Sequence, residues 1–368
     1  MNTSAVWLAG FRGGLISPHE RIRLAEPITF ADATVRQSLR LAGGGSRFRV
    51  RISNRFGRTA LTVGAARAGE HALLFDGAEP VTVPAGAEIF SDAVDVAVEP
   101  GADLVVSLYL PEPTGPATAA SQPGQTALVV PGDRTADADL PDAERLPYRV
   151  FLDAVDVFAE PRPVLAAFGD SWFEGVGTTP DAHLRSVDVL NRELGRGWAV
   201  NLGIAGNRLL RTEVGPSALD RFEHDVLAVP GISLVLVNFG INDLVLGGYT
   251  GERPPTAAAM IAGYTELARR AHDAGLPIHA ATIGPFAGCE YPNLTVDEGI
   301  PIRREVNEWL RTTTVFDSVA DIARAVEDPA RPDHLAPELD SGDCMHLNDA
   351  GAHLMAVELL AALPAVVH

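Results

Sequence analysis

The residues of this chain best suited to chemistry stand in four short clusters in its second half. Each cluster consists mostly of small and polar residues, three of them follow directly after an apolar run, and the fourth precedes a helix. The clusters are residues 169–172, 203–207, 240–243 and 343–348. Because ligands of an open α/β sheet bind beyond the carboxyl ends of its strands, clusters that follow such runs converge. The sequence therefore predicts one site at this edge.

Ser171, His346 and Asp343 have the types and spacing of a nucleophile, its base and an orienting acid. Ser171 lies on the turn that leaves the apolar run 164–168 and can present its hydroxyl group there. Asp343 precedes His346 by three residues, so its carboxylate can accept the imidazole N–H, fix the tautomer and stabilise the imidazolium. A serine hydroxyl with such a base is typical of acyl transfer.

Three donors can hold the negative charge that develops on a carbonyl oxygen during such an attack. They are the backbone N–H of Ser171, the backbone N–H of Gly206, which no side chain covers, and the side-chain amide of Asn242. Taken alone, each cluster also fits an ordinary turn, a helix cap or an exposed ion pair. Their shared position at the ends of separate elements favours a catalytic site.

The elements that must position these residues alternate between strand and helix. Apolar runs predict strands at 164–168, 198–202, 232–239, 277–283 and 315–319. Helical spacing predicts helices at 182–194, 217–229, 256–274 and 301–312, and a last helix, capped by Asn348 or Asp349, that reaches about residue 360. This alternation predicts an α/β domain with a doubly wound parallel sheet.

The first half of the chain has the pattern of an all-β domain. Apolar and polar residues alternate at 35–41 and 47–52 with three glycines between the runs, which predicts a hairpin. Further short strands are predicted at 61–65, 72–75, 93–98, 103–110 and 149–158. We expect an antiparallel, jelly-roll-like β-sandwich over residues 1–160 and the α/β domain over 161–368, with Pro161 and Pro163 at the boundary.

The composition excludes several classes of protein. Asp and Glu number 48 against 29 Lys and Arg, and a net charge of −19 argues against binding to nucleic acid or an anionic membrane. Every basic residue is arginine, so lysine chemistry is excluded. Residues 354–367 are too short and interrupted to span a membrane, and the chain opens on no leader pattern. We expect a soluble cytoplasmic protein, or a secreted one if a leader was removed.

Other groups offer weaker alternatives. Cys289 and Cys344 are expected as two free thiols, with a single bridge as the alternative. A metal held by Asp343, Cys344 and His346 would lack a further ligand at a convincing spacing, so no metal is expected. The basic stripe on the strand at 47–52 predicts a solvated face, with an anionic-ligand surface as the alternative; it consists of Arg47, Arg49, Arg51 and Arg55.

The four clusters together resemble the blocks of the SGNH hydrolases, also called the GDSL esterase and lipase superfamily. Ser171 matches the first-block serine, Gly206 the second-block glycine, Asn242 the third-block asparagine, and Asp343 and His346 the acid and base of the last block. Residues 206–210 and 341–343 resemble a bacterial branch in which a β-sandwich precedes the hydrolase domain. Two positions depart from the pattern, Trp172 in place of leucine and Leu347 in place of proline.

This resemblance implies a flavodoxin-like, three-layer hydrolase domain and ester hydrolysis without a metal or organic cofactor. The expected substrates are small acyl or acetyl esters of a sugar or small metabolite, and Trp172 and Asp170 are expected to contact them. One alternative is an acyltransferase that uses the same site in metabolite biosynthesis. The other is a carbohydrate-binding protein with a degenerate hydrolase half. The sequence leaves the oligomeric state open.

Overall fold

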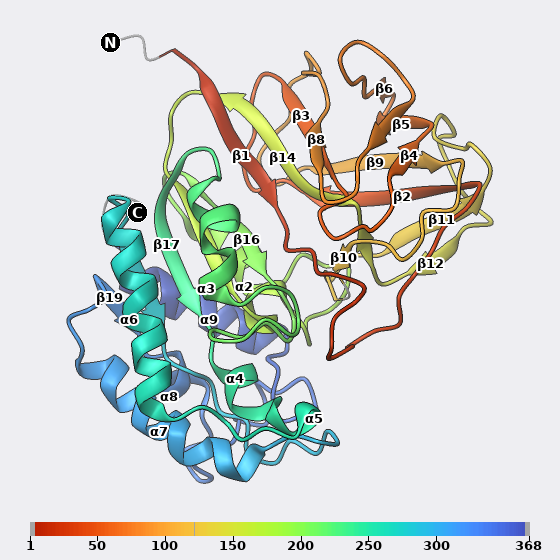
Figure 1. Ribbon diagram of the computed structural model, residues 1–368. Coiled ribbons are helices and arrows are strands. Elements are labelled where there is room, and N and C mark those ends of the chain that lie inside the picture. Colours follow the sequence, from red (N-terminus) through yellow and green to blue (C-terminus); the bar gives the residue numbers. More distant parts are fainter. Residues whose placement is uncertain (1–3, 121, 365–368) are drawn as a thin grey trace. The chain divides into compact units, whose positions relative to one another are not determined.

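A computed structural model describes residues 4–120 and 122–364 of the chain (Figure 1). The chain divides into two compact units, Met1–Pro161 and Arg162–His368. Residues 1–3 and 365–368, which belong to the terminal segments considered for a leader and a membrane span, lie outside the described residues. Among the described residues, no helix combines the length and the apolar character needed to cross a membrane.

The second unit is built on a parallel sheet. Its strands are β15 (Val164–Gly169), β16 (Trp198–Gly203), β17 (Ile232–Asn238), β18 (Ile278–Ala281) and β19 (Ser318–Ala320). They pair in the order β16-β15-β17-β18-β19, which in chain order is 2-1-3-4-5, the order of flavodoxin-like doubly wound sheets. The predicted parallel sheet is confirmed. Every residue of β15 is buried, as expected of a strand covered on both faces.

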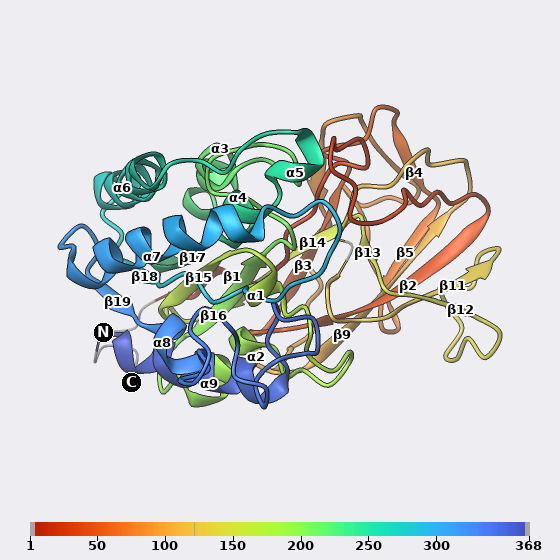
Figure 2. The same ribbon diagram turned by 90° about the horizontal axis from the view of Figure 1, so that it is seen from below.

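Helices cover both faces of this sheet (Figure 2). They are α1 (Ser171–Glu174), α2 (Ser186–Glu193), α3 (Ala218–Phe222), α4 (Ile241–Val245), α5 (Gly247–Thr250), α6 (Ala257–Asp273), α7 (Val296–Thr312), α8 (Ile322–Val326) and α9 (Asp349–Ala362). Helix α3 continues into a π-helical turn, Glu223–Leu227. Helices α3, α4, α6 and α7 lie on one side of the sheet, and α2, α8 and α9 lie on the other.

Two helices begin several residues away from their predicted starts. Helix α2 begins at Ser186 rather than at residue 182, because Asp181 and His183 adopt left-handed backbone angles, with φ of 60° and 56°. Helix α7 begins at Val296 and contains Pro301, which was expected at its start. The acidic first turn of α7, with Asp297 and Glu298, favours this earlier beginning through the helix dipole.

The first unit is a β domain whose sheets are antiparallel. Its longer strands are β1 (Val6–Arg12), β2 (Ala33–Arg40), β3 (Phe48–Ser53), β9 (Asp103–Leu110), β11 (Ala127–Pro131) and β14 (Leu152–Ala159). The shorter strands are β4 (Leu61–Val63), β5 (Ala65–Ala68), β6 (His71–Ala72), β7 (Val81–Val83), β8 (Glu88–Phe90), β10 (Ala119–Ala120), β12 (Glu144–Leu146) and β13 (Arg149–Val150). One sheet has the order β1-β14-β3-β8 and another β12-β11-β2-β9-β5-β6.

The hairpin predicted around the three glycines at 43–45 is wrong. Strands β2 and β3 belong to different sheets, since β2 pairs with β9 and β11 while β3 pairs with β14 and β8. Between them the chain bonds to other segments: the N–H of Ala42 donates to the carbonyl of Gly10 and the N–H of Gly45 donates to that of Val98. The glycines therefore carry the chain from one sheet to the other instead of closing a tight turn.

The basic stripe on β3 is matched by carboxylates and aromatic rings. Its ion pairs include Arg47–Asp95, Arg49–Asp156 and Arg51–Asp153. The guanidinium of Arg49 also lies over the rings of Trp7 and Phe90, at 4.7 and 4.3 Å from their centroids. Carboxylates therefore partner three of the four arginines of the stripe.

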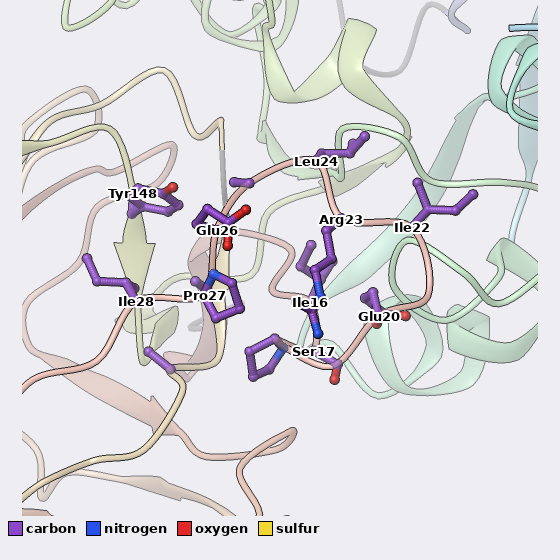
Figure 3. Close-up of a pocket in the computed structure, with 14 residues that line it drawn as sticks. Ile16, Ser17, Glu20, Ile22, Arg23, Leu24, Glu26, Pro27, Ile28 and Tyr148 are labelled. Carbon is purple, nitrogen blue, oxygen red and sulfur yellow. The ribbon is translucent and has the colours of Figure 1, made fainter. Parts of the chain in front are cut away.

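The first unit also contains a pocket of its own (Figure 3). Its wall is mostly apolar and comes largely from the segment 16–28, and Tyr148 joins it from a later part of the chain. Glu26 and Arg23 are exposed at this pocket. None of the residues predicted to carry chemistry lines this pocket, because all of them belong to the second unit.

Candidate active site

Ser171 is the first residue of α1, directly beyond the carboxyl end of β15. The side chain of Asp170 caps this helix by accepting the N–H of Trp172 at 3.2 Å. The helix ends after one turn at Gly175, whose φ of 100° requires glycine, and a Cβ there would lie 2.2 Å from Arg185. This short turn fixes the backbone on both sides of a serine that is 5% exposed.

The structure brings Ser171, His346 and Asp343 into one chain of hydrogen bonds. Nε2 of His346 lies 3.0 Å from Oγ of Ser171, and Nδ1 of the same ring lies 2.6 Å from Oδ2 of Asp343. With Nδ1 protonated and donating to the carboxylate, Nε2 is free to accept the serine proton. The arrangement can thus activate the hydroxyl group of Ser171 for attack on a carbonyl carbon.

Asp343 is held as a carboxylate by several donors. Its Oδ1 accepts the N–H groups of Met345 and His346 at 2.9 and 2.8 Å, and its Oδ2 accepts the hydroxyl group of Tyr291 at 3.1 Å. Burial raises the pKa of Asp343, but the hydrogen bonds and charge of His346 outweigh burial and hold that pKa below its ordinary value. The group is therefore ionised at neutral pH and can stabilise an imidazolium.

Tyr291 is a residue that the sequence analysis missed. Its side chain is 50% exposed, while its hydroxyl group reaches Asp343. Burial of the hydroxyl group, followed by the charge of Asp343, raises the pKa of Tyr291 to about 12, so the phenol remains a donor. No local spacing links positions 291 and 343, and only the fold brings them together.

The loop that carries His346 is tied down at both ends. The N–H of Ser341 donates to the carbonyl of His346 at 2.9 Å, and the side chain of Asn348 caps α9 by accepting the N–H groups of Ala350 and Gly351. Gly177 packs beneath the loop, where a Cβ would lie 2.6 Å from the carbonyl oxygen of Leu347. The position of His346 is thus set by the packing of Gly177 against the loop and by the cap of α9, although His346 itself lies in neither a helix nor a strand.

The oxyanion donors predicted from the sequence lie at the same edge of the sheet. Asn242, in α4 after β17, donates from Nδ2 to Oδ2 of Asp170 at 3.3 Å and to the carbonyl of Asn207 at 3.1 Å. Gly206 has a φ of 78°, which glycine adopts without strain. Within the described part of the chain, the backbone N–H groups of Ser171 and Gly206 donate no hydrogen bond. Both remain available to a ligand.

Two buried carboxyl groups support this edge. Burial raises the pKa of Asp170 to about 7 and that of Asp243 to about 6. Asp243 accepts the N–H groups of Leu209 and Leu210 at 2.7 and 3.0 Å, and so holds the loop that carries Gly206. Asp170 is 1% exposed and accepts the hydrogen bond from Asn242.

Arg221 and Glu174 also support the site, and the sequence analysis did not single them out. Arg221 is fully buried and donates to the carbonyls of Gly169 and Leu202, both at strand ends, and to Oδ1 of Asn207. Glu174 accepts the N–H of Ala205. The only sequence signal was a charged side chain at a position where the helical pattern predicts burial. The partners of these two residues are distant in the sequence, so the pattern did not identify them.

Trp172 connects the nucleophile turn to the histidine loop. Its ring is 3% exposed, and its Nε1 donates to the carbonyl of Met345 at 3.0 Å. On its other side a Cβ on Gly284 would lie 2.0 Å from the ring. The indole therefore contacts Met345 and Gly284, and it is buried between them.

Cys289 and Cys344 are both free thiols, as the sequence favoured. Burial raises the pKa of each thiol above its ordinary value. Among residues 4–120 and 122–364, no group of three or more His, Cys, Asp or Glu side chains is arranged to hold a metal ion.

Comparison with known proteins adds a family to this geometry. A profile described as the GDSL-like lipase/acylhydrolase family matches residues 167–354, which include every residue of the predicted site. A search of curated proteins finds no match.

Three of the similar solved structures differ in the kind of protein and in the share of this chain that they cover. An aryl esterase from M. smegmatis is 16% identical, with 55% of this chain and 100% of that chain covered and a TM-score of 0.45. A GDSL-like lipase from Bacteroides thetaiotaomicron is 16% identical, with coverage of 54% and 86% and a TM-score of 0.41. A carbohydrate esterase family 2 enzyme plus carbohydrate-binding domain from Corynascus thermopiles (Myceliophthora fergusii) is 14% identical, with coverage of 97% and 98% and a TM-score of 0.43.

Proposed function

Since the chain belongs to the GDSL-like lipase/acylhydrolase family and is a carboxylic ester hydrolase, we propose that it works through a triad of Ser171, His346 and Asp343. The observation that carries this proposal is the pair of contacts of 3.0 and 2.6 Å that link these three side chains. A degenerate hydrolase half, one of the alternatives from the sequence, is disfavoured because every member of the triad is present and connected.

In the first half-reaction, Oγ of Ser171 attacks the ester carbonyl carbon while Nε2 of His346 takes the hydroxyl proton. The carbonyl oxygen becomes an oxyanion, held by the N–H groups of Ser171 and Gly206 and the amide of Asn242. When the intermediate collapses, His346 returns the proton to the leaving alkoxide, and the alcohol departs. Ser171 is then acylated.

In the second half-reaction, water takes the place of the alcohol. His346 removes a proton from the water, the resulting hydroxide attacks the acyl carbon, and the proton passes to Oγ of Ser171 as the carboxylic acid leaves. Asp343 remains ionised throughout and stabilises each imidazolium. The amide of Asn242 donates to Asp170 in this structure. When the oxyanion forms, the amide either donates to both oxygens or gives up Asp170 for the oxyanion.

The substrates that we propose are small acyl or acetyl esters of a sugar or small metabolite. The residues around the nucleophile are closely packed: Ser171, Trp172 and Asn242 are each 5% exposed or less. We assign Trp172 and Asp170 an indirect influence on the substrate, because their contacts set the positions of the histidine loop and of Asn242.

For the first unit we propose a jelly-roll-like β-sandwich over residues 1–160 that acts as an accessory domain. Its support is the burial of alternate residues on strands of both larger sheets, such as Val35 and Leu39 on β2 and Val50 and Ile52 on β3.

A substrate screen tests the proposed activity. Acetylated sugars, simple esters of increasing acyl length and lactones are incubated with the wild type and with Ser171→Ala, with and without an added alcohol acceptor. We expect hydrolysis of short acyl esters by the wild type alone. A new ester that forms with the acceptor and exceeds the free acid, measured by mass spectrometry, would instead establish the acyltransferase.

A further inference from the structure

Two exposed tyrosines stand out on the second unit. Tyr249 is 42% exposed and Tyr291 is 50% exposed, and within the described residues no other Phe, Trp or Tyr side chain is exposed to this degree. Exposed aromatic rings of this kind combine an apolar face with a polar tip, which suits recognition of a ligand that has both. Both tyrosines are therefore candidates for contact with a ligand.

The segments that carry these rings are packed against each other. Tyr249 belongs to α5, and a Cβ on the neighbouring Gly248 would lie 2.2 Å from the carbonyl oxygen of Asn293, two residues beyond Tyr291. The N–H of Thr295 further donates to the carbonyl of Val245 at 2.9 Å. The two tyrosines thus share one stretch of surface that the backbone holds together.

This surface adjoins the acid of the triad. An open cavity of about 670 Å³, which includes open solvent, is lined by Gly288, Glu290, Tyr291, Gly342, Asp343 and Cys344. Its lining includes no aliphatic side chain, and it contains two carboxylates, Glu290 and Asp343. A long acyl chain would find no apolar wall here, and an anionic ligand would be repelled.

The chemistry of the proposed reaction says which part of the ester faces this cavity. The carbonyl oxygen points to the donors at Ser171, Gly206 and Asn242. The leaving oxygen must approach Nε2 of His346 to receive its proton. The alcohol portion therefore lies close to the loop of His346 and Asp343, and the hydroxyl group of Tyr291 bonds to Asp343 of this loop.

We propose, on the basis of the function above, that Tyr291, Tyr249 and Glu290 form a subsite for the leaving group. The subsite takes a neutral, hydroxyl-bearing six-membered ring such as a pyranose. The apolar face of the ring packs on the tyrosines, and Glu290 accepts hydrogen bonds from its hydroxyl groups. Tyr291 is in addition a positioning residue, because its hydroxyl group and the imidazole of His346 bond to the same oxygen of Asp343.

Three esters with a common acetyl group separate these roles: an acetylated methyl pyranoside, vinyl acetate, whose leaving group has no ring, and phenyl acetate. The variants are Tyr291→Ala, Tyr291→Phe and Tyr249→Ala. Val357→Ala, at an exposed apolar position of α9 outside the cavity lining, is the matched control. Thermal unfolding of each variant verifies that it is folded.

We expect Tyr291→Ala and Tyr249→Ala to lower kcat/KM for the pyranoside about tenfold more than for vinyl acetate, mainly through KM, since each removes a ring face. Tyr291→Phe keeps the ring and loses the bond to Asp343, so it should lower kcat for all three esters by a similar factor. Val357→Ala should change none of them.

The subsite proposal is wrong if both alanine variants lower kcat/KM for the pyranoside and vinyl acetate equally, or if only phenyl acetate shows the selective loss. This failure is distinct from failure of the proposed function. If vinyl acetate is still hydrolysed and Ser171→Ala abolishes its hydrolysis, the triad stands and only the subsite falls.

Discussion

At the scale of single residues, the central feature is that one oxygen of Asp343 serves two partners. Oδ2 accepts from His346 at 2.6 Å and from Tyr291 at 3.1 Å, while Oδ1 accepts two backbone N–H groups. All of these donors stabilise the carboxylate. Asp343 therefore remains ionised and, in the proposed triad, orients His346.

Replacement of Asp343 by Asn tests this arrangement. An amide at this position keeps the shape of the side chain but can present its N–H to the imidazole, which favours the wrong tautomer. We expect kcat for a small activated ester to fall by about 10³- to 10⁴-fold. Steady-state kinetics measures the change, and a loss of less than tenfold in a folded variant would remove Asp343 from the triad.

Asn242→Ala tests the oxyanion donor. Loss of a single donor of this kind costs about 10²- to 10³-fold in kcat, and KM should change little because the ground-state carbonyl makes weaker use of the donor. The control is Asn191→Ala. It removes a side-chain amide that forms hydrogen bonds with the backbone of Ala199, away from the predicted site. An equal fall in kcat for both variants would show a general effect of packing instead.

The residues that we propose to react were singled out from the sequence, while those that contact and position them were not. Ser171, Gly206, Asn242, Asp343 and His346 stand in short segments with telling neighbours. Tyr291, Glu174 and Arg221 act through contacts across 31 to 52 residues of chain. Such contacts leave no local spacing to read.

At the scale of elements, the turn that carries Ser171 is linked to the loop that carries His346 by one side chain, that of Trp172. The indole N–H of Trp172 donates to the carbonyl of Met345 across 173 residues of sequence. Because the ring is buried and Gly284 packs against it, movement of α1 relative to this loop would have to break the bond or the packing.

Trp172→Phe should lower both stability and kcat. The carbonyl of Met345 loses its partner in a buried position, at a cost of about 1–3 kcal/mol in the free energy of unfolding. The smaller ring also loosens the spacing between Ser171 and His346, so kcat should fall by about tenfold or more.

The matched control for this prediction is Trp309→Phe on α7. Trp309 packs with Tyr264 and Phe316 within the same unit and contacts no residue of the triad. Chemical denaturation and steady-state kinetics of the two variants are compared. If Trp309→Phe lowers kcat as much as Trp172→Phe does, the indole has no specific part in positioning the site.

Elements were predicted well where the pattern was strong and poorly where the backbone deviates from a regular form. The apolar run at 232–239 became β17 almost residue for residue. The helix predicted at 217–229 is instead α3 followed by a π-helical turn, and α2 is shortened by left-handed residues before it. Hydrophobic spacing does not encode a left-handed angle at Asp181 or His183.

At the scale of the whole molecule, the sequence did not predict which strands pair with β2 and β3 in the first unit. Alternating residues predicted strands in the first unit, but the partners of β2 and β3 depend on contacts far along the chain. For the second unit, the alternation of strand and helix left little freedom of topology, and the predicted parallel sheet is present.

The buried carboxyl groups predict how the stability of the molecule depends on pH. The pKa of Asp170 is raised by burial to about 7, so the folded state binds a proton more tightly than the unfolded state does. Its contribution to stability is complete below about pH 4 and is lost as the pH rises towards about 7. Asp170→Asn, which stays neutral, should gain stability relative to the wild type over this interval.

Urea unfolding at about pH 4.5 and about pH 7.5 measures this effect, with the difference between variant and wild type taken at each pH. We expect the difference to shift in favour of Asp170→Asn by at least about 1.4 kcal/mol, the equivalent of one pKa unit. Asp297→Asn, in the exposed first turn of α7, is the control. A shift of equal size in the control, or no shift at all, would contradict the assignment.

The most direct test of the account is the identity of the residue that a fluorophosphonate modifies. Wild type, Ser171→Ala and His346→Ala are treated with the reagent and the modified peptide is located by mass spectrometry. We expect a single adduct on Ser171 in the wild type, none in Ser171→Ala, and labelling slowed by at least about 10³-fold in His346→Ala. An adduct on another residue, or full esterase activity in Ser171→Ala, would contradict the central claim.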